Sequence, residues 1–428
     1  MAKPLDYTIL RDAMISGAMA FRAVTDLDPA GGGGDKVFPP TYQGGVYARE
    51  QRVNDGVEVP CVLLDSVQSQ ANRLELALLD WHRCSEVGKK PFPLVQIDFT
   101  NSEAKEVGLF SVLEAPHRIA DAVFLASEIK EVETEKPIRF RDPKEPAKGS
   151  KIGRIVDDAN ARNASGLFGL CPSALIFGMW DSHGARGGLG EKFQRALVSE
   201  VFGVGSTVDN RRPASRADPL LVVAGESLPI KENEDGSWSS VEKGTGNSKL
   251  SNVGLGNVTP SLKVPPNKRK DFESEFNHGG VTIRFARQIT VLSLPALRRL
   301  HFPVRGKTAE EQAEANIEAR TTLAALALAA VARQWHSGFS LRSRCDLVPR
   351  KELTFELLKP GGKEDFDLPV DAATELLSKA AAAAKQDGLS WPTASEREWK
   401  DGCLKLTPSI DLAKAIARSR QLASQNRD

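Results

Sequence analysis

The sequence predicts an α+β fold, in which helices and strands mix without a regular βαβ rhythm. Residues 281–292 alternate between apolar and polar side chains as a strand does, whereas 310–335 have the composition and charge order of a long helix. The 428 residues, 41% of them hydrophobic, are enough to bury a large core. No internal repeat of about 20–50 residues is visible. We therefore expect either two or three domains or one heavily elaborated domain.

The first hundred residues predict a helix, a strand, a glycine loop, a second helix and a second strand. The second helix has the clearest start, because Asp65 can act as its N-cap, with Gln68 in the capping-box position three residues later. Its apolar residues recur at the spacing of one buried face. In order, the elements are a helix over 5–14, a strand over 18–29, a loop at the four glycines 31–34, a helix from Asp65 through Trp81, and a strand over 93–99.

The rest of the chain predicts fewer strands, separated by two long polar stretches. The helix over 310–335 is acidic early and cationic late, and Gly338 follows it as a stop signal. In order, we expect an apolar segment over 109–125, a charged surface loop over 131–154, a buried strand over 174–180, a helix over 192–201, a partly β excursion over 203–277, strands over 281–292 and 339–349, and helices over 310–335 and 370–386.

Charge is balanced over the whole chain and concentrated in patches. The 57 basic and 56 acidic residues give a formal net charge of +1, which excludes the uniform positive field of a generic polyanion binder. Residues 263–305 nevertheless carry nine basic and three acidic side chains, and a second basic cluster follows at 342–351. Each patch is either a polyanion-binding surface or an ordinary solvated face.

The helix that begins near Asp65 is rich in hydrogen-bonding side chains on one face. Ser66, Ser69 and Arg73 would gather near the positive end of the helix dipole, where backbone N–H groups also favour an anion. This pattern predicts contact with phosphate groups. Serine, glutamine and asparagine are also common capping residues, so an ordinary helix start remains open.

No catalytic or metal-binding motif stands out. Asp181, Ser182 and His183 are adjacent, but catalytic triads converge from separate segments, and a hydrolase centred on Ser182 and His183 is the weakest of our three hypotheses. We favour a glycine-flanked turn that places His183 and Arg186 on a ligand backbone. The histidines and five cysteines have no zinc-site spacing, so we expect neither a metal nor another cofactor, although a two-metal site assembled in space remains open.

The chain gives no sign of export or of membrane insertion. Its first residues carry charge and are not followed by the apolar core of a secretory signal. The longest strongly apolar run, 321–332, is too short to cross a bilayer. We therefore expect a cytoplasmic protein without a membrane partner.

Three segments together resemble a known family. They are 63–75 (LLDSVQSQANRLE), 171–184 (CPSALIFGMWDSHG) with 193–200 (FQRALVSE), and 341–349 (LRSRCDLVP). In combination they resemble the backbone RAMP subunit of the type I-G (formerly type I-U) CRISPR Cascade. The resemblance runs over most of the chain, but 131–154 and 203–277 match no motif of that family.

The resemblance implies a single elaborated RAMP domain, 1–428, with an RRM-like (ferredoxin-like) palm. The palm would comprise 1–84, 165–202 and 278–428, with a finger-like insertion at 85–164 and a flexible thumb-like insertion at 203–277. The implied function is non-catalytic binding of CRISPR RNA by copies of the subunit, which present the guide for pairing with target DNA. The implied partners are CRISPR RNA, target DNA, other copies of the chain, the large subunit, the subunit that processes and caps the guide end, and transiently a helicase-nuclease.

Residues and resemblance together give a set of expected RNA contacts. Phosphate binding needs Arg, Lys, hydroxyls, amides and helix N-termini rather than a catalytic constellation. The alternative is a metal-dependent ribonuclease that acts on guide-complementary RNA. The expected RNA-binding residues are Ser66, Gln68, Ser69, Gln70, Asn72, Arg73, His183, Arg186, Arg284, Arg287, Arg342 and Arg344.

Overall fold

The computed structural model describes most of the chain, and helices and strands are mixed in it. The described residues are 2–43, 46–54, 56–134, 136–181, 192–207, 229–233, 237–241, 245–246, 248–249, 279–395 and 397–425. Strand pairing within them is mostly antiparallel. The predicted α+β class is therefore confirmed.

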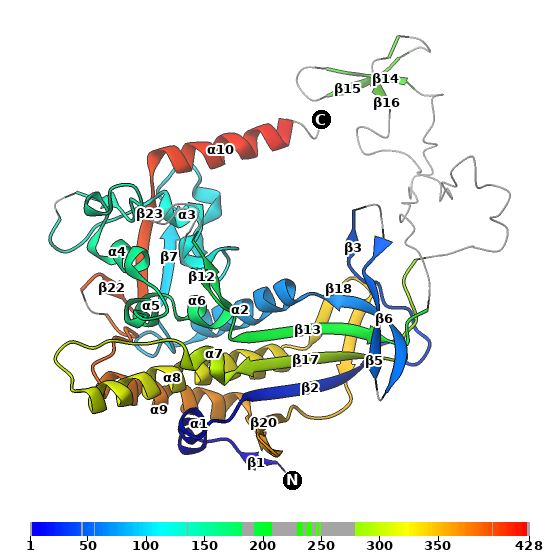
Figure 1. The fold of residues 1–428 in the computed structure, drawn as a ribbon. Helices are drawn as coiled ribbons and strands as arrows, with labels where there is room; N and C mark the ends of the chain where they lie inside the picture. Colours follow the sequence, from blue (N-terminus) through cyan, green and yellow to red (C-terminus); the bar gives the residue numbers. More distant parts are fainter. Residues whose placement is uncertain are drawn as a thin grey trace.

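A ten-stranded sheet forms the centre of the fold, and Figure 1 shows β2, β17 and β13 side by side in it. The path across the sheet runs β1-β21-β20-β2-β17-β13-β6-β5, and β19 pairs with both β2 and β18. Its strands are β1 (Lys3–Pro4), β2 (Ala20–Pro29), β5 (Arg49–Asn54), β6 (Val57–Asp65), β13 (Leu197–Val204), β17 (Phe285–Ser293), β18 (Phe339–Arg342), β19 (Cys345–Pro349), β20 (Phe355–Lys359) and β21 (Gly362–Asp367).

A second, six-stranded sheet joins two distant parts of the chain. β23 pairs in parallel with β7, so the C-terminal strand lies beside a strand from the predicted finger insertion. Residues 399–408, which the resemblance assigns to the palm, thus lie in this second sheet rather than in the ten-stranded one (Figure 1). Its strands are β7 (Leu94–Asp98), β8 (Leu109–Ser111), β9 (Ser127–Ile129), β10 (Ile138–Arg139), β22 (Trp399–Lys400) and β23 (Cys403–Pro408).

Short strand pairs and helices complete the described elements. The pairs are β3 (Thr41–Tyr42) with β4 (Val46–Tyr47), β11 (Met179–Trp180) with β12 (Lys192–Phe193), and β14 (Pro229–Glu232) with β15 (Trp238–Ser240) and β16 (Ser248–Lys249). The helices are α1 (Tyr7–Ile15), α2 (Val67–Cys84), η1 (Lys105–Val107), η2 (Arg118–Ala120), α3 (Ala122–Leu125), η3 (Pro146–Lys148), α4 (Lys151–Asp158), α5 (Ser165–Leu170), α6 (Pro172–Phe177), α7 (Leu294–Arg298), α8 (Ala309–His336), α9 (Val370–Gln386) and α10 (Ile410–Gln425).

Four strands of the large sheet are joined by two helical connections of the same kind. Across the sheet the strands lie in the order β20-β2-β17-β13, with each adjacent pair antiparallel. In the sequence α2 lies between β2 and β13, and α8 lies between β17 and β20. Each helix thus separates two strands that run parallel to each other with one antiparallel strand between them.

The long helix α8 passes through the hydrophobic core. Its start is fixed by a capping box, in which the Thr308 side chain accepts from the backbone N–H of Glu311, and Glu311 accepts from that of Thr308. Within the described part of the chain, α8 is the one helix that is long and apolar enough to cross a membrane, judged by length and composition alone. However, 83% of its most apolar window is buried in the protein, so burial in the core accounts for its composition.

Three predicted elements differ from the structure in the middle of the chain. The strand predicted over 174–180 is mostly α6, because Pro172 begins a helix at its N1 position and Gly178, with φ +84°, ends it. The helix predicted over 192–201 is wrong, since β13 pairs with β6 and β17 on its two sides. The predicted surface loop over 131–154 is partly wrong, because Arg141 within it is buried and pairs with Asp157.

Two strand predictions need smaller corrections. The strand predicted over 339–349 is a hairpin of β18 and β19, with Arg344 at φ +59° in its turn. The strand predicted over 281–292 is β17, which begins at Phe285. Its more buried face carries Gln288 and Thr290 rather than its more apolar residues, because α2 and α8 offer polar partners there.

Candidate nucleic-acid interface

The helix α2 begins one residue later than predicted. Asp65 is the last residue of β6, and Ser66 is the N-cap, its side chain accepting from the backbone N–H of Ser69 at 3.3 Å. Gln68 consequently holds no capping-box position. The predicted helix is confirmed over Val67–Cys84, but the assignment of Asp65 as its cap is wrong.

Asp65 instead forms the centre of a hydrogen-bond network. Its side chain is fully buried and accepts from Ser69 Oγ at 2.8 Å, from Gln70 Nε2 at 2.6 Å and from Arg73 Nε at 2.8 Å. Arg342, from β18, adds a contact at 3.3 Å and ties the β18–β19 hairpin to the start of α2. We call these five residues the Asp65 network. Four of the expected RNA contacts thus have an internal partner in this chain.

Gln70 lies deepest in this network. It is 0% exposed, and its Oε1 accepts from Ser199 Oγ at 3.0 Å and from Gln288 Nε2 at 2.8 Å. Gln288 also donates to Gln334 of α8 at 3.1 Å. The polar side chains therefore join α2 and α8 to β13 and β17 inside the protein, where each buried polar group needs a partner. The prediction that Gln70 contacts RNA is wrong for this chain as folded, because its side chain has no access to the surface.

Gln68 and Asn72 lie on another face of α2. They are exposed and four residues apart, the spacing that brings two side chains to one helix face. Both line a cleft of about 750 Å³, which we call the α2 cleft. Its described lining residues are Gln68, Ala71, Asn72, Pro116, His117, Arg118, Phe177, Gly178, Met179, Trp180, Lys192, Phe193, Gln194 and Arg195.

A buried ion pair supports the floor of the α2 cleft. Arg118 donates to both carboxylate oxygens of Glu75, at 2.6 and 2.7 Å, and to the backbone carbonyl of Gly178 at 2.8 Å. Arg118 has φ +54°, which is unusual for a residue with a side chain. Burial raises the pKa of Glu75 to about 7, and the Arg118 guanidinium opposes that rise. The pair connects α2 to the turn between α6 and β11.

That turn carries the aromatic and cationic side chains of the cleft. Arg195 Nε donates to the carbonyl of Phe177 at 3.2 Å, so two arginines hold consecutive carbonyls of the turn. Gly178 has φ +84°, and a Cβ there would lie 2.9 Å from the carbonyl oxygen of Phe193. In the following pair of β11 with β12, Trp180 is opposite Lys192, whose Nζ lies 5.1 Å from the indole centroid.

The charges of the α2 cleft have one sign. Its described lining includes Arg118, Lys192 and Arg195 but no aspartate or glutamate. The guanidinium of Arg118 is bound by Glu75 and by the Gly178 carbonyl, which leaves Lys192 and Arg195 as the cations available beside the amides of Gln68 and Asn72. Cations, amides and an exposed tryptophan are the groups that bind phosphates and unpaired bases. The arrangement therefore suits a nucleic-acid strand.

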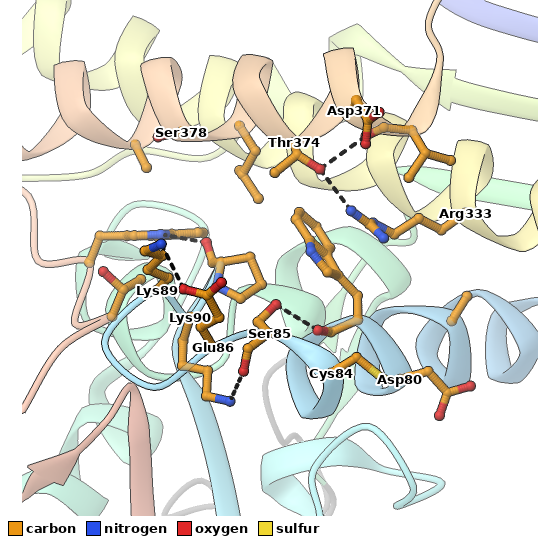
Figure 2. A pocket seen from close by; sticks show the side chains of 18 of the residues that line it. Asp80, Cys84, Ser85, Glu86, Lys89, Lys90, Arg333, Asp371, Thr374 and Ser378 are labelled. Carbon is orange, nitrogen blue, oxygen red and sulfur yellow. Dashed lines mark hydrogen bonds and ion pairs between the residues drawn. The ribbon is translucent and has the colours of Figure 1, made fainter.

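A second cleft, about 970 Å³ in volume, lies at the other end of α2 (Figure 2). Its described lining contains both cations and carboxylates, with Lys89, Lys90, Arg333 and Lys385 as well as Asp80, Glu86 and Asp371. Arg333 donates to Thr374 Oγ1 at 2.7 Å, and its guanidinium lies 3.7 Å from the centroid of Trp81. The mixed charges make this cleft a poorer match for a polyanion.

The remaining expected RNA contacts lie elsewhere. Arg284 is exposed just before β17, and Arg344 is exposed in the hairpin turn with its guanidinium 4.6 Å from the centroid of Phe38. Arg287 forms an ion pair with Asp26 at 2.7 Å. His183 and Arg186 lie outside the described residues. The expected set is therefore divided among the N-cap Ser66, the Asp65 network, the α2 cleft and these separate positions.

The two catalytic hypotheses find no supporting cluster of side chains among the described residues. Ser182 and His183, the centre of the hydrolase hypothesis, lie outside the described residues. Among the residues that are described, no three His, Cys, Asp or Glu side chains gather closely enough to hold a metal ion.

Sequence reasoning missed Trp180, Lys192, Gln194 and Arg195 as site residues. Trp180 lies within the 171–184 segment, and the other three lie in or beside 193–200, which was expected to form a helix. If that segment is read as a strand, Lys192 and Gln194 point outward and Phe193 between them points into the protein, as the structure has them. The polar–apolar–polar alternation of Lys192, Phe193 and Gln194 was the signal available in the sequence.

Comparisons with known proteins give one match by sequence family. Residues 21–208 match the family model described as CRISPR-associated protein GSU0053. No curated protein matches the chain. Among solved structures, Csc2 from Thermofilum pendens is 12% identical with a TM-score of 0.27, over 96% of this chain and 92% of that one, a similarity too low to establish a shared fold. The matched range includes β2, α2, β13 and every described residue that lines the α2 cleft, so this part of the chain is similar to a CRISPR-associated family.

Proposed function

We propose that this protein is a non-catalytic backbone subunit of a type I CRISPR effector complex. In this role several copies bind one CRISPR RNA and present it for pairing with target DNA, together with the other subunits of a Cascade-type complex in the cytoplasm. The observation that carries the proposal is the α2 cleft, whose described lining is cationic and free of carboxylates, within the range that matches a CRISPR-associated family.

The topology of the large sheet supports the same proposal. We infer that the β2, α2, β13, β17, α8 and β20 series is an RRM-like (ferredoxin-like) palm, since its strand order and its two helix connections fit a βαββαβ unit. In this palm α2 connects the first two strands and presents the α2 cleft at its N-terminal half. The thumb-like insertion over 203–277 stays a prediction, since most of it lies outside the described residues.

The assignment to type I-G rests on the resemblance of the three sequence segments.

A backbone subunit requires groups that hold a phosphate chain without cleaving it, and Lys192, Arg195, Gln68 and Asn72 supply such groups. The near-zero net charge suits a protein that packs against copies of itself. The partners proposed here are CRISPR RNA, target DNA and the remaining effector subunits.

The test is the nucleic acid that the protein carries from cells. The chain is co-expressed with its CRISPR array and partner subunits, purified, and analysed by absorbance ratio, particle size and sequencing of the extracted RNA. We expect uniform spacer-repeat RNA in a large particle. Lys192→Glu should lower the RNA content strongly, whereas Lys130→Glu, at an exposed lysine outside the cleft, should not.

Two outcomes would contradict the proposal. A nucleic-acid-free monomer obtained with the array and partners present would remove the guide-binding role. Cleavage of guide-complementary RNA in magnesium, lost on substitution of one aspartate, would replace the scaffold role with a ribonuclease.

A further inference from the structure

We propose that the α2 cleft takes an unpaired stretch of nucleic acid, with one base stacked on the indole of Trp180. This inference rests on the proposed function and specifies the ligand of the same site. Stacking on the indole requires a single strand rather than a duplex, a distinction that the charges of the cleft alone do not make.

Trp180 is exposed where a tryptophan would normally be covered. It keeps 48% of its surface accessible although Lys192 lies over the ring at 5.1 Å from the centroid. Its neighbours Met179 and Phe193 are buried, so the two-residue period of β11 and β12 sends Trp180 and Lys192 to the opposite, outer face. A large aromatic surface beside a cation is therefore available on the cleft wall.

The backbone that carries Trp180 is held in place before any ligand arrives. The carbonyls of Phe177 and Gly178, directly before β11, accept from Arg195 and Arg118. Arg118 is itself fixed by two hydrogen bonds to Glu75 of α2. A ring on an immobilised strand loses little conformational freedom when a base stacks on it, which favours binding.

The surrounding groups fit a single strand. The amides of Gln68 and Asn72 offer donors and acceptors to base edges or sugar, and Lys192 and Arg195 offer charge to phosphates. A base within a duplex is stacked on both faces and paired at its edge, so it cannot lay a free face on the indole. An unpaired base can, and aromatic stacking tolerates any base because each has a π-face.

The experiment follows tryptophan fluorescence and affinity during titration with RNA. The probe is a 12-nucleotide single-stranded RNA, and the comparison ligands are the same RNA annealed to its complement and the DNA strand of equal sequence. The variants are Trp180→Ala, Trp180→Phe and, as the matched control, Trp238→Phe in β15, where the tryptophan is 41% exposed outside the cleft. Thermal unfolding of each variant shows whether it is folded.

We expect the wild type to prefer the single strand and to show quenched fluorescence on binding. Trp180→Phe should lose the quenching while keeping most of the affinity, Trp180→Ala should bind roughly 5- to 100-fold more weakly, and Trp238→Phe should keep both. Equal affinity of Trp180→Ala and wild type for the single strand would overturn the stacking proposal and leave the guide-binding function intact. Tighter binding of the duplex would also overturn it, and a wild type without RNA affinity would overturn both.

Discussion

The two polar faces of the N-terminal half of α2 contain similar residues in opposite situations. On one face Ser69, Gln70 and Arg73 donate to the buried Asp65. On the other, Gln68 and Asn72 are exposed and line a cleft whose described residues include no carboxylate. Hydrogen-bonding side chains near a helix start are thus available to a ligand only where the fold gives them no internal acceptor.

The ends of α2 differ in the same way. The α2 cleft has cations without carboxylates among its described lining residues, whereas the cleft at the C-terminal end mixes both charges. Because a polyanion is repelled by interspersed carboxylates, the first cleft is the better nucleic-acid surface. The following substitutions test these contrasts, beginning with the largest expected effect.

Asp65→Asn should destabilise the fold most. The carboxylate is fully buried and accepts from two arginines and two neutral donors, so its neutralisation leaves two half-buried guanidinium groups without their counter-charge and a buried network with one acceptor weakened. We expect a loss of about 3–5 kcal/mol in the free energy of unfolding, measured by chemical denaturation. Asp80→Asn, at an exposed position of the same helix, is the control and should change stability by less than about 0.5 kcal/mol. A loss of similar size in both variants would contradict the central role of Asp65.

Arg73→Ala should act mainly on stability rather than on RNA affinity. Arg73 pairs with Asp65 at 2.8 Å and also donates to the backbone carbonyl of Leu341, while Arg342 remains to share the carboxylate. We expect a loss of about 2 kcal/mol in unfolding free energy. Binding of the 12-nucleotide RNA by the folded variant, measured by fluorescence anisotropy, should stay within about twofold of wild type, because the guanidinium faces inward. A loss of binding without a loss of stability would restore the original prediction that Arg73 grips the guide.

Asn72→Ala should show the reverse of Arg73→Ala at the neighbouring position. Its side chain is exposed on the α2 cleft, so its removal should leave thermal unfolding unchanged. We expect RNA affinity to fall about 3- to 10-fold, the effect of one or two lost hydrogen bonds. Gln68→Ala, four residues earlier on the same face, should behave alike. Unchanged RNA affinity in the double variant would separate this face of α2 from the nucleic-acid interface.

The pH dependence of stability should show the most gradual effect, through Glu75. Burial raises its pKa from 4.5 to about 7, so between these values the folded chain holds a proton that the unfolded chain has released. Raising the pH across this window therefore favours unfolding, and the contribution of Glu75 to stability is present below about pH 4.5 and lost by about pH 7, at a rate of at most about 1 kcal/mol per pH unit.

Glu75→Gln is the variant that measures this effect. Between pH 4.5 and 7 its unfolding free energy should fall less steeply with pH than that of the wild type. Breaking the pair with Arg118 also shifts the whole curve by a constant amount, which does not change this slope. Parallel curves for the two proteins would mean that Arg118 holds Glu75 ionised throughout this range.

The sequence predicted well those elements whose signals are local. The helix α9 is confirmed at its predicted bounds, and α8 within two residues, because caps, charge order and periodicity all lie within the helix itself. The strand β13 was predicted as a helix, since its pairing partners β6 and β17 are distant in the sequence. The strand predicted over 174–180 failed because a short apolar run does not distinguish a buried helix from a strand.

The candidate site was predicted in part for the same reason. Composition and spacing alone determined that α2 begins with a polar, phosphate-compatible surface, and they indicated Gln68 and Asn72 among its residues. Only the tertiary structure decided that Asp65, with Arg342 277 positions later in the chain, takes the other polar groups, and that Lys192 and Trp180 meet across a strand pair beside them. The amino-acid sequence fixes which hydrogen-bonding groups the chain has, whereas folding decides which of them are already satisfied, because a buried group must find its partner inside the protein.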